Sequence, residues 1–96
     1  MEYDAVVVGA GMAGLTAAAY LCKAGKSVAL LEKRGKTGGL VDSFERNGFT
    51  FDGGIRAVEN SGIVFPMLRQ LGVELEFLQS PVSIGFGDDV LRLSPE

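Results

Sequence analysis

The protein has 96 residues, of which 47% are hydrophobic, 22% are charged and 14 are glycine, and its formal net charge is -3. This is the composition of a folded globular chain, and the weak negative charge gives no electrostatic footprint for nucleic acid or an anionic lipid surface. With no histidine and the single cysteine Cys22, the chain excludes an internal disulfide, a Cys/His zinc cluster and a histidine-based triad. We expect no metal site, and Cys22 is expected to be a buried thiol.

The first third of the chain predicts a βαβ unit. Tyr3–Val8 is an apolar run without alternation, which is typical of a strand buried on both faces. Leu15–Ala24 is rich in Ala and Leu and is followed by Gly25, so it predicts a helix. Lys26–Glu32 predicts a second buried strand. Strand, helix and strand in about 30 residues indicate parallel strands with a right-handed crossover.

An uncharged stretch, Ala5–Cys22, has the length of a membrane span or a signal peptide. Its flanks argue against both, because Glu2 and Asp4 precede it where a signal peptide carries Lys or Arg, and three glycines interrupt it. We therefore expect no transmembrane segment and a cytoplasmic location.

Three glycines follow the first strand and open the helix in the spacing G-x-G-x-x-G. The first permits a tight turn, the second leaves room for a diphosphate, and the third lets the helix pack closely on the strand. The helix N-terminus would offer N–H groups and about half a positive charge to phosphates. We therefore predict a dinucleotide-binding loop made of Gly9, Ala10, Gly11, Met12, Ala13 and Gly14.

An acidic residue, Glu32, ends the second strand where this fingerprint places the ribose-binding carboxylate. Its carboxylate can accept both hydroxyls of an adenosine ribose and would repel a 2′-phosphate. FAD and NAD therefore remain as cofactors, and NADP is disfavoured. The alternative is a glycine turn that serves only close packing.

The rest of the chain predicts two hairpins with a helix between them. Asn47-Gly48 joins Val41–Arg46 to Phe49–Asp52 in a type I′ turn that places three phenylalanines on one face, expected to be core. A helix is expected over Ser61–Leu71, and Val73–Phe77 alternates like a half-buried strand. The second hairpin is predicted over residues 82–93, with a three-residue Gly-Asp-Asp turn.

The segment VVVGAGMAGLTAAAYLCKAGKSVALLEKRGKTGG resembles the N-terminal motif of flavin-dependent amine oxidases and phytoene desaturases, the carotenoid desaturase-like group of the glutathione-reductase-like FAD superfamily. In that group a strand-ending Glu-Lys, here Glu32 and Lys33, is followed after a basic loop by Gly-Gly, here Gly38 and Gly39. A segment G-F-x-F-D-x-G also recurs, here residues 48–54, and residues 86–89 resemble a later F-x-D-G stretch. The resemblance covers essentially the whole chain.

This resemblance implies the positions of the cofactor contacts. Gly38 and Gly39 would hold the pyrophosphate together with the first glycine loop, and Gly54 would lie near the flavin end. Lys33 and Leu40 are also expected to bind the cofactor. Many members carry arginine where this chain has Leu40, so a guanidinium contact is absent there. Arg34 and Arg56 are either replacements for it or solvated loop cations.

The resemblance also implies the organisation and the activity. We expect residues 1–96 to be the N-terminal portion of a single FAD-binding domain, an incomplete α/β domain that is inactive alone and could oligomerise through its open sheet edge. The implied reaction is hydride transfer from an amine or alkene precursor to flavin. The small-molecule substrate and the catalytic residues would belong to an absent domain, so no catalytic residue is named. An NAD-dependent Rossmann dehydrogenase and a non-catalytic dinucleotide-binding module are the alternatives.

Overall fold

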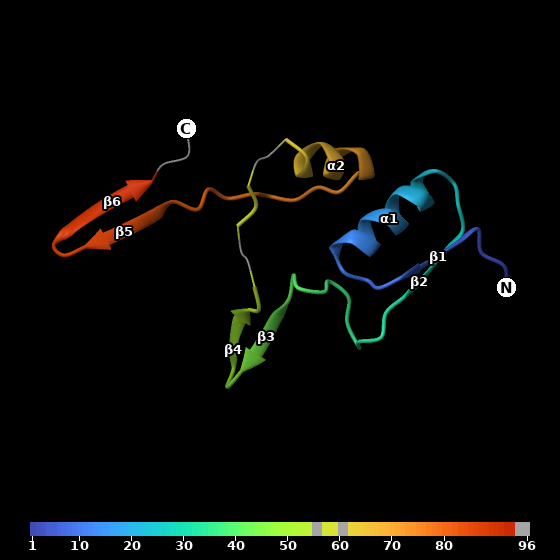
Figure 1. Ribbon diagram of the computed structural model, residues 1–96, viewed down its shortest axis with the longest axis horizontal. Helices are drawn as coiled ribbons and strands as arrows, with labels where there is room; N and C mark the ends of the chain where they lie inside the picture. The colour runs from blue at the N-terminus through green and yellow to red at the C-terminus, as the bar shows by residue number, and fades with distance from the viewer. Residues whose placement is uncertain (55–56, 60–61, 94–96) are drawn as a thin grey trace.

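The computed structural model describes residues 1–54, 57–59 and 62–93, so Arg56 and Ser61 lie outside the described residues. Within these ranges, two helices and six strands follow one another (Figure 1). In order they are β1 (Ala5–Val8), α1 (Met12–Lys23), β2 (Val28–Leu31), β3 (Ser43–Arg46), β4 (Phe49–Asp52), α2 (Val64–Leu71), β5 (Val82–Phe86) and β6 (Asp89–Leu93).

The predicted βαβ unit is confirmed. β1 and β2 are parallel, with Ala5 opposite Val28 and Val8 opposite Leu31, and α1 connects them along one side (Figure 1). α1 begins at Met12, earlier than expected, because Gly11 serves as its N-cap and Gly14 stays inside the first turn. Both strands are shorter than predicted. The carboxyl ends of β1 and β2 therefore meet beside the start of the helix.

A hydrogen-bonded pair, Asp4 and Ser27, fixes the opposite end of the two strands. The Asp4 carboxylate accepts bonds from the Ser27 N–H at 2.8 Å and from its hydroxyl at 3.0 Å. The backbone N–H of Asp4 donates to the same hydroxyl at 3.0 Å. These bonds join the amino-terminal ends of the two strands, whose carboxyl ends Val8 and Leu31 lie opposite each other.

Close packing of α1 on β1 depends on Gly14. A Cβ added at Gly14 would overlap the carbonyl oxygen of Gly9 and would lie 3.4 Å from Val7 Cγ1. The role expected for the third glycine is therefore confirmed. Among the described residues, the buried hydrophobic side chains are Ala10 and Ala18, which are 0% and 8% exposed.

Both predicted hairpins form. In the first, Phe44 lies opposite Phe51, and the turn residues Asn47 and Gly48 have φ of 52° and 78°, as a type I′ turn requires. The paired phenylalanine rings stack at 5.4 Å, yet each residue is 47% exposed, so the expectation of a core was wrong. In the second hairpin Phe86 pairs with Asp89, which leaves a turn one residue shorter than predicted.

Two further predictions were wrong. Residues 73–77 form no strand, because none of the described strands pairs with them, and Phe77 instead packs edge-on against Phe65 of α2 at 4.8 Å. Cys22 is exposed, because it lies in the last turn of α1, next to the end of the helix at Lys23. The end of α2 agrees with prediction, since Gly72 adopts φ 70° and its N–H caps the helix.

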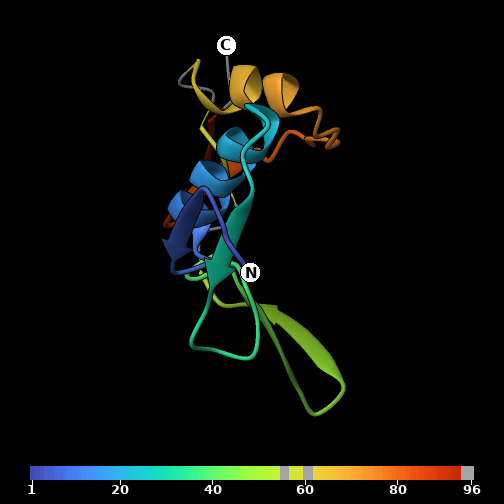
Figure 2. The same cartoon turned by 90° about the vertical axis from the view of Figure 1, so that its right-hand side faces the viewer.

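The elements are spread over an elongated molecule that measures 64 × 36 × 18 Å. Its radius of gyration is 18.1 Å, whereas a compact domain of this length has about 13 Å. The strands form three separate two-stranded sheets, and the β3–β4 hairpin projects away from the βαβ unit (Figure 2). Val8 and Leu31 are 81% and 55% exposed. The described residues therefore share no common core, and pairing of an open sheet edge with a second copy stays a prediction.

Across the described ranges, neither helix is both long and apolar enough to cross a lipid bilayer. The uncharged stretch Ala5–Cys22 is instead divided between β1, the glycine bend and α1. The cytoplasmic location stays a prediction.

We expect Gly14→Ala to destabilise the intact protein by at least about 2 kcal/mol, because the new Cβ would meet backbone that cannot move aside. Gly35→Ala is the matched control, since a Cβ at Gly35 meets nothing within 4 Å. Thermal unfolding followed by circular dichroism measures both variants. Equal melting temperatures for Gly14→Ala and the unmodified protein would contradict the packing described here.

Candidate functional site

The glycine bend begins where β1 ends. Gly9 has φ 98°, a conformation that favours glycine, and its N–H donates to the carbonyl oxygen of Leu31 at 2.7 Å. This bond extends the β1–β2 ladder by one step before the chain turns into α1. The next residue, Ala10, is fully buried. The bend is therefore held by both strands rather than standing free in solvent.

Glu32 links the end of β2 to this bend. Its Oε2 accepts a hydrogen bond from the N–H of Ala10 at 2.8 Å, and its Oε1 accepts one from the N–H of Arg34 at 2.9 Å. The N–H of Arg34 and then that of Ala10 are the main reasons why the pKa of Glu32 lies below its ordinary value. A carboxylate offers about four acceptor directions, so Glu32 can hold the bend and still accept hydroxyl groups.

The second glycine pair, Gly38 and Gly39, docks onto the first bend. The N–H of Gly38 donates to the carbonyl oxygen of Ala10 at 2.7 Å, and Gly38 forms a parallel bridge with Gly11. A Cβ on Gly39 would stand only 3.0 Å from the Cα of Gly11. Two stretches far apart in the sequence therefore meet with their backbones bare, and together they form one surface without side chains.

Gly11 differs from the other glycines of this surface. Its φ of -76° suits any residue, and an added Cβ would meet only the Cα of Gly39, at 3.9 Å. The folded chain itself therefore tolerates alanine here. A glycine that neither conformation nor packing requires indicates space kept for a ligand.

The start of α1 faces this surface with its positive end. Neither Gly11, as N-cap, nor any acidic residue in the first turn caps the helix N-terminus through a side chain. The N–H groups at the start of a helix carry about half a positive charge, and they favour an anion. The residues present therefore fit a diphosphate, which the bare backbone can admit and the helix end can attract.

An open hollow of about 430 Å³ lies at the carboxyl ends of β1 and β2. It is lined by Val8, Gly9, Leu31, Glu32 and Lys33. Ligands of parallel α/β sheets bind at this end of the strands. The position agrees with a nucleoside resting on Glu32.

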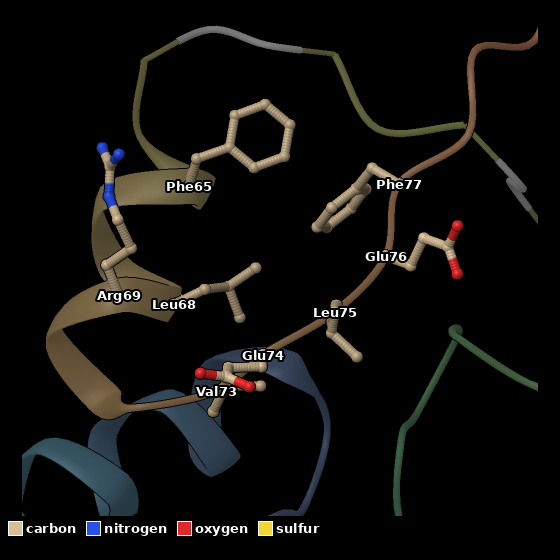
Figure 3. A pocket seen from close by; sticks show the side chains of 8 residues that line it. All are labelled: Phe65, Leu68, Arg69, Val73, Glu74, Leu75, Glu76 and Phe77. Carbon is tan, nitrogen blue, oxygen red and sulfur yellow. The ribbon is translucent and has the colours of Figure 1, made fainter.

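A larger hollow of about 570 Å³ lies elsewhere, between α2 and residues 73–77. Figure 3 shows Phe65 and Phe77 turned toward each other across it, with Glu76 pointing away. Its lining includes both Glu74 and Arg69 and contains no glycine, so it offers no bare backbone to a diphosphate. We therefore place the candidate site at the glycine bend and not in the larger hollow.

The structure thus brings together most of the residues predicted for the site. Met12 and Ala13 are the first residues of α1, and Lys33 follows Glu32 at the hollow. Leu40 is 93% exposed, and a Cβ on Gly54 would lie 2.9 Å from its carbonyl oxygen. Gly54 is therefore adjacent to the second glycine pair through Leu40. Whether each of these residues contacts a cofactor stays a prediction.

Asp42 is a residue that sequence reasoning missed. Its carboxylate pairs with Lys36 and lies 3.7 Å from the guanidinium of Arg34. Lys36 is the main cause that lowers the pKa of Asp42, through a hydrogen bond to the carboxylate. Arg34 is thus a paired cation rather than a merely solvated one. A lone acid shortly after three basic residues was the signal that could have found it.

The charge of Glu32 can be tested by titration. The pKa of Glu32 is lowered in the folded protein. The hydrogen bond from the N–H of Ala10 to the carboxylate is therefore fully present above the ordinary glutamate pKa of about 4.3, and it is lost as the pH falls through the lowered pKa. The amide resonance of Ala10 in NMR spectra should titrate with a midpoint below about 4.3. In Glu32→Gln this titration should vanish. A midpoint at or above the ordinary value would contradict the hydrogen bonds described.

Comparison with known proteins agrees with this geometry. A family model described as an NAD(P)-binding Rossmann-like domain matches residues 7–71. Chloroplastic prolycopene isomerase of carrot (Daucus carota) is 36% identical over 91 residues, covering 88% of this chain and 15% of the carrot protein. Human all-trans-retinol 13,14-reductase is 51% identical over 57 residues, covering 59% of this chain and 9% of the human protein.

A solved structure is also similar. It is a putrescine oxidase double mutant from a redesign of cofactor binding, with a TM-score of 0.66 and 30% sequence identity, and the match covers 97% of this chain and 22% of that one. This chain therefore spans less than a quarter of the length of each of these relatives. They confirm the resemblance to amine oxidases and carotenoid desaturase-like proteins. Since the family model matches more than half of the chain, the protein belongs to the family of NAD(P)-binding Rossmann-like domains.

Proposed function

We propose that this chain binds the ADP part of FAD in a flavin-dependent oxidoreductase, as the N-terminal portion of that enzyme's FAD-binding domain. The observation that carries the proposal is the side-chain-free surface where Gly11 meets Gly38 and Gly39 at the start of α1. In this arrangement the diphosphate would rest on backbone N–H groups, and Glu32 would accept the ribose hydroxyls.

The residues around the surface favour a ligand whose adenosine ribose carries no 2′-phosphate. The Glu32 carboxylate is ionised at neutral pH, since its pKa is lowered by the N–H groups of Arg34 and Ala10. A 2′-phosphate beside it would face like-charge repulsion. NADP is therefore disfavoured, although the family's description includes it.

The choice of FAD over NAD has separate support. The backbone surface would accept the diphosphate of either cofactor, so it does not distinguish them. The second glycine pair and the segment 48–54 resemble flavin-dependent amine oxidases and phytoene desaturases, and a putrescine oxidase shares the fold. When bound, a flavin supplies hydride transfer, chemistry that no side chain of this protein offers.

The relatives support a polyene more than an amine as substrate. Two of them, with 36% and 51% identity, are named for prolycopene and all-trans-retinol, and both compounds are conjugated polyenes. The amine oxidase is less similar, at 30% identity. We therefore propose that the intact enzyme acts on an alkene within a long apolar molecule. Its substrate residues would lie outside this chain.

A non-catalytic role is the second candidate. A zebrafish (Danio rerio) relative, 49% identical over 51 residues, is named an inactive all-trans-retinol 13,14-reductase. A relative can therefore keep this segment without the activity. Bound flavin without turnover of any alkene or amine in the intact protein would favour this candidate.

The proposal predicts that the intact protein is purified with bound FAD. We expect a yellow preparation that absorbs near about 450 nm and releases FAD on denaturation. After the cofactor is removed, calorimetry should detect binding of FAD and no binding of NADP. A colourless protein that binds NAD with micromolar affinity would contradict the flavin and favour a dehydrogenase.

Gly11→Ala tests the binding surface without disturbing the fold. Because the added Cβ has room in the protein itself but would occupy the ligand space, we expect at least about tenfold weaker binding of FAD. The melting temperature should fall by no more than about a few degrees, since alanine is a poorer N-cap than glycine. Gly35→Ala should change neither quantity. Unchanged FAD affinity in Gly11→Ala would show that the ligand does not approach this backbone.

A further inference from the structure

The basic loop between β2 and β3 is closed by one acidic side chain. Asp42 pairs through Oδ1 with Lys36 and through Oδ2 with Arg34, and the ammonium group of Lys36 also donates to the carbonyl oxygen of Ser43 at 3.1 Å. The Asp42 side chain is 24% exposed, whereas those of Arg34 and Lys36 are 52% and 50% exposed. The carboxylate is thus the least exposed member of the cluster.

The backbone around Asp42 is hydrogen-bonded to Gly53 and lies next to a residue bonded to Gly38. The carbonyl oxygen of Asp42 accepts a bond from the N–H of Gly53 at 2.7 Å. One residue earlier, the N–H of Val41 donates to the carbonyl oxygen of Gly38 at 3.1 Å. A displacement of Asp42 would therefore be passed to Gly38 through a single short turn.

The same side chain completes a ring of interactions around the candidate site. Arg34 is held at its side chain by Asp42 and at its N–H by Glu32, and Glu32 in turn holds the N–H of Ala10. The ring closes where the N–H of Gly38 donates to the carbonyl oxygen of Ala10. Asp42 lies on the side of this ring that carries the second glycine pair.

We propose that Asp42 is a positioning residue, which holds Gly38 and Gly39 against Ala10 and Gly11 before any ligand arrives. By pairing with Arg34 and Lys36 it also keeps two cations from repelling each other inside a short loop. The effect of Asp42 on the affinity for a ligand rests on the proposed function. The effect of Asp42 on the stability of the loop is independent of the proposed function.

The size of the effect follows from the exposure of the pairs. An exposed ion pair shifts an equilibrium by at most about fivefold, and Asp42 makes two pairs. We therefore expect Asp42→Asn to open the loop about 3- to 10-fold more often, without unfolding the protein.

Hydrogen exchange of the intact, cofactor-free protein tests the loop directly. In Asp42→Asn, peptides covering residues 34–42 should exchange about 3- to 10-fold faster, and those of α1 should not change. Glu45→Gln is the matched control, because it removes the same charge from the adjacent strand β3, where Glu45 is exposed. Unchanged exchange in Asp42→Asn would overturn the proposal.

A charge-dependent readout separates positioning from a merely structural role. High salt should speed exchange of residues 34–42 in the unmodified protein and have little effect in Asp42→Asn. Adding Lys36→Met to Asp42→Asn should cause less further change than Lys36→Met causes alone. Independent, additive effects of the two substitutions would overturn the proposal.

Binding of FAD to the intact protein supplies the last test. We expect Asp42→Asn to weaken FAD binding by about 3- to 10-fold, and Glu45→Gln to leave it unchanged. Tighter binding in Asp42→Asn would overturn the proposal, because it would show that Asp42 competes with the phosphates for Arg34 and Lys36. If the unmodified protein protects its loop but binds no FAD, the proposed function fails while the positioning role stands.

Discussion

The structure depends on a contact between two pieces of backbone, the first turn of α1 and the end of β1. Because Gly14 lies against the carbonyl oxygen of Gly9, the helix can start directly beside the strand instead of standing a side chain's width away. This closeness aims the helix N-terminus at the carboxyl ends of both parallel strands. It also leaves Gly11 at the surface, where Gly38 and Gly39 can dock. The same packing of α1 on β1 that stabilises the βαβ unit therefore also forms the candidate site.

The charged side chains of the site lie around this backbone surface, and the surface itself contains none of them. Positive potential at the glycine bend comes from the start of α1, while the nearby cations Arg34 and Lys36 are engaged by Asp42. The acidic groups Glu32 and Asp42 hold loops through N–H groups and ion pairs, and both have lowered pKa values for that reason. An anion bound here would meet oriented dipoles that are fixed before binding, which reduces the cost of reorganisation.

Local chemistry explains which parts of the molecule the sequence could predict. The glycine spacing and the turn at Asn47 and Gly48 act through nearby backbone, so the βαβ unit and the first hairpin follow from pattern alone. The acid at position 32 lies beside the glycine bend, while its role toward a cofactor stays a prediction. Residues 73–77 carry a strand pattern, but a strand also needs a partner edge, and no sequence pattern shows whether one is present. The exposure of Cys22 and of the stacked phenylalanines depends on distant packing for the same reason. Asp42 was missed because its partners are set by the shape of the loop.

The central claim is that a dinucleotide diphosphate lies on bare backbone at the start of α1. A crystal structure of the intact protein with its cofactor tests this most directly. The account predicts diphosphate oxygens within hydrogen-bonding distance of N–H groups in the bend between Gly9 and Gly14, with a ribose against Glu32. A cofactor bound elsewhere, or a protein side chain filling the space over Gly11, would contradict it.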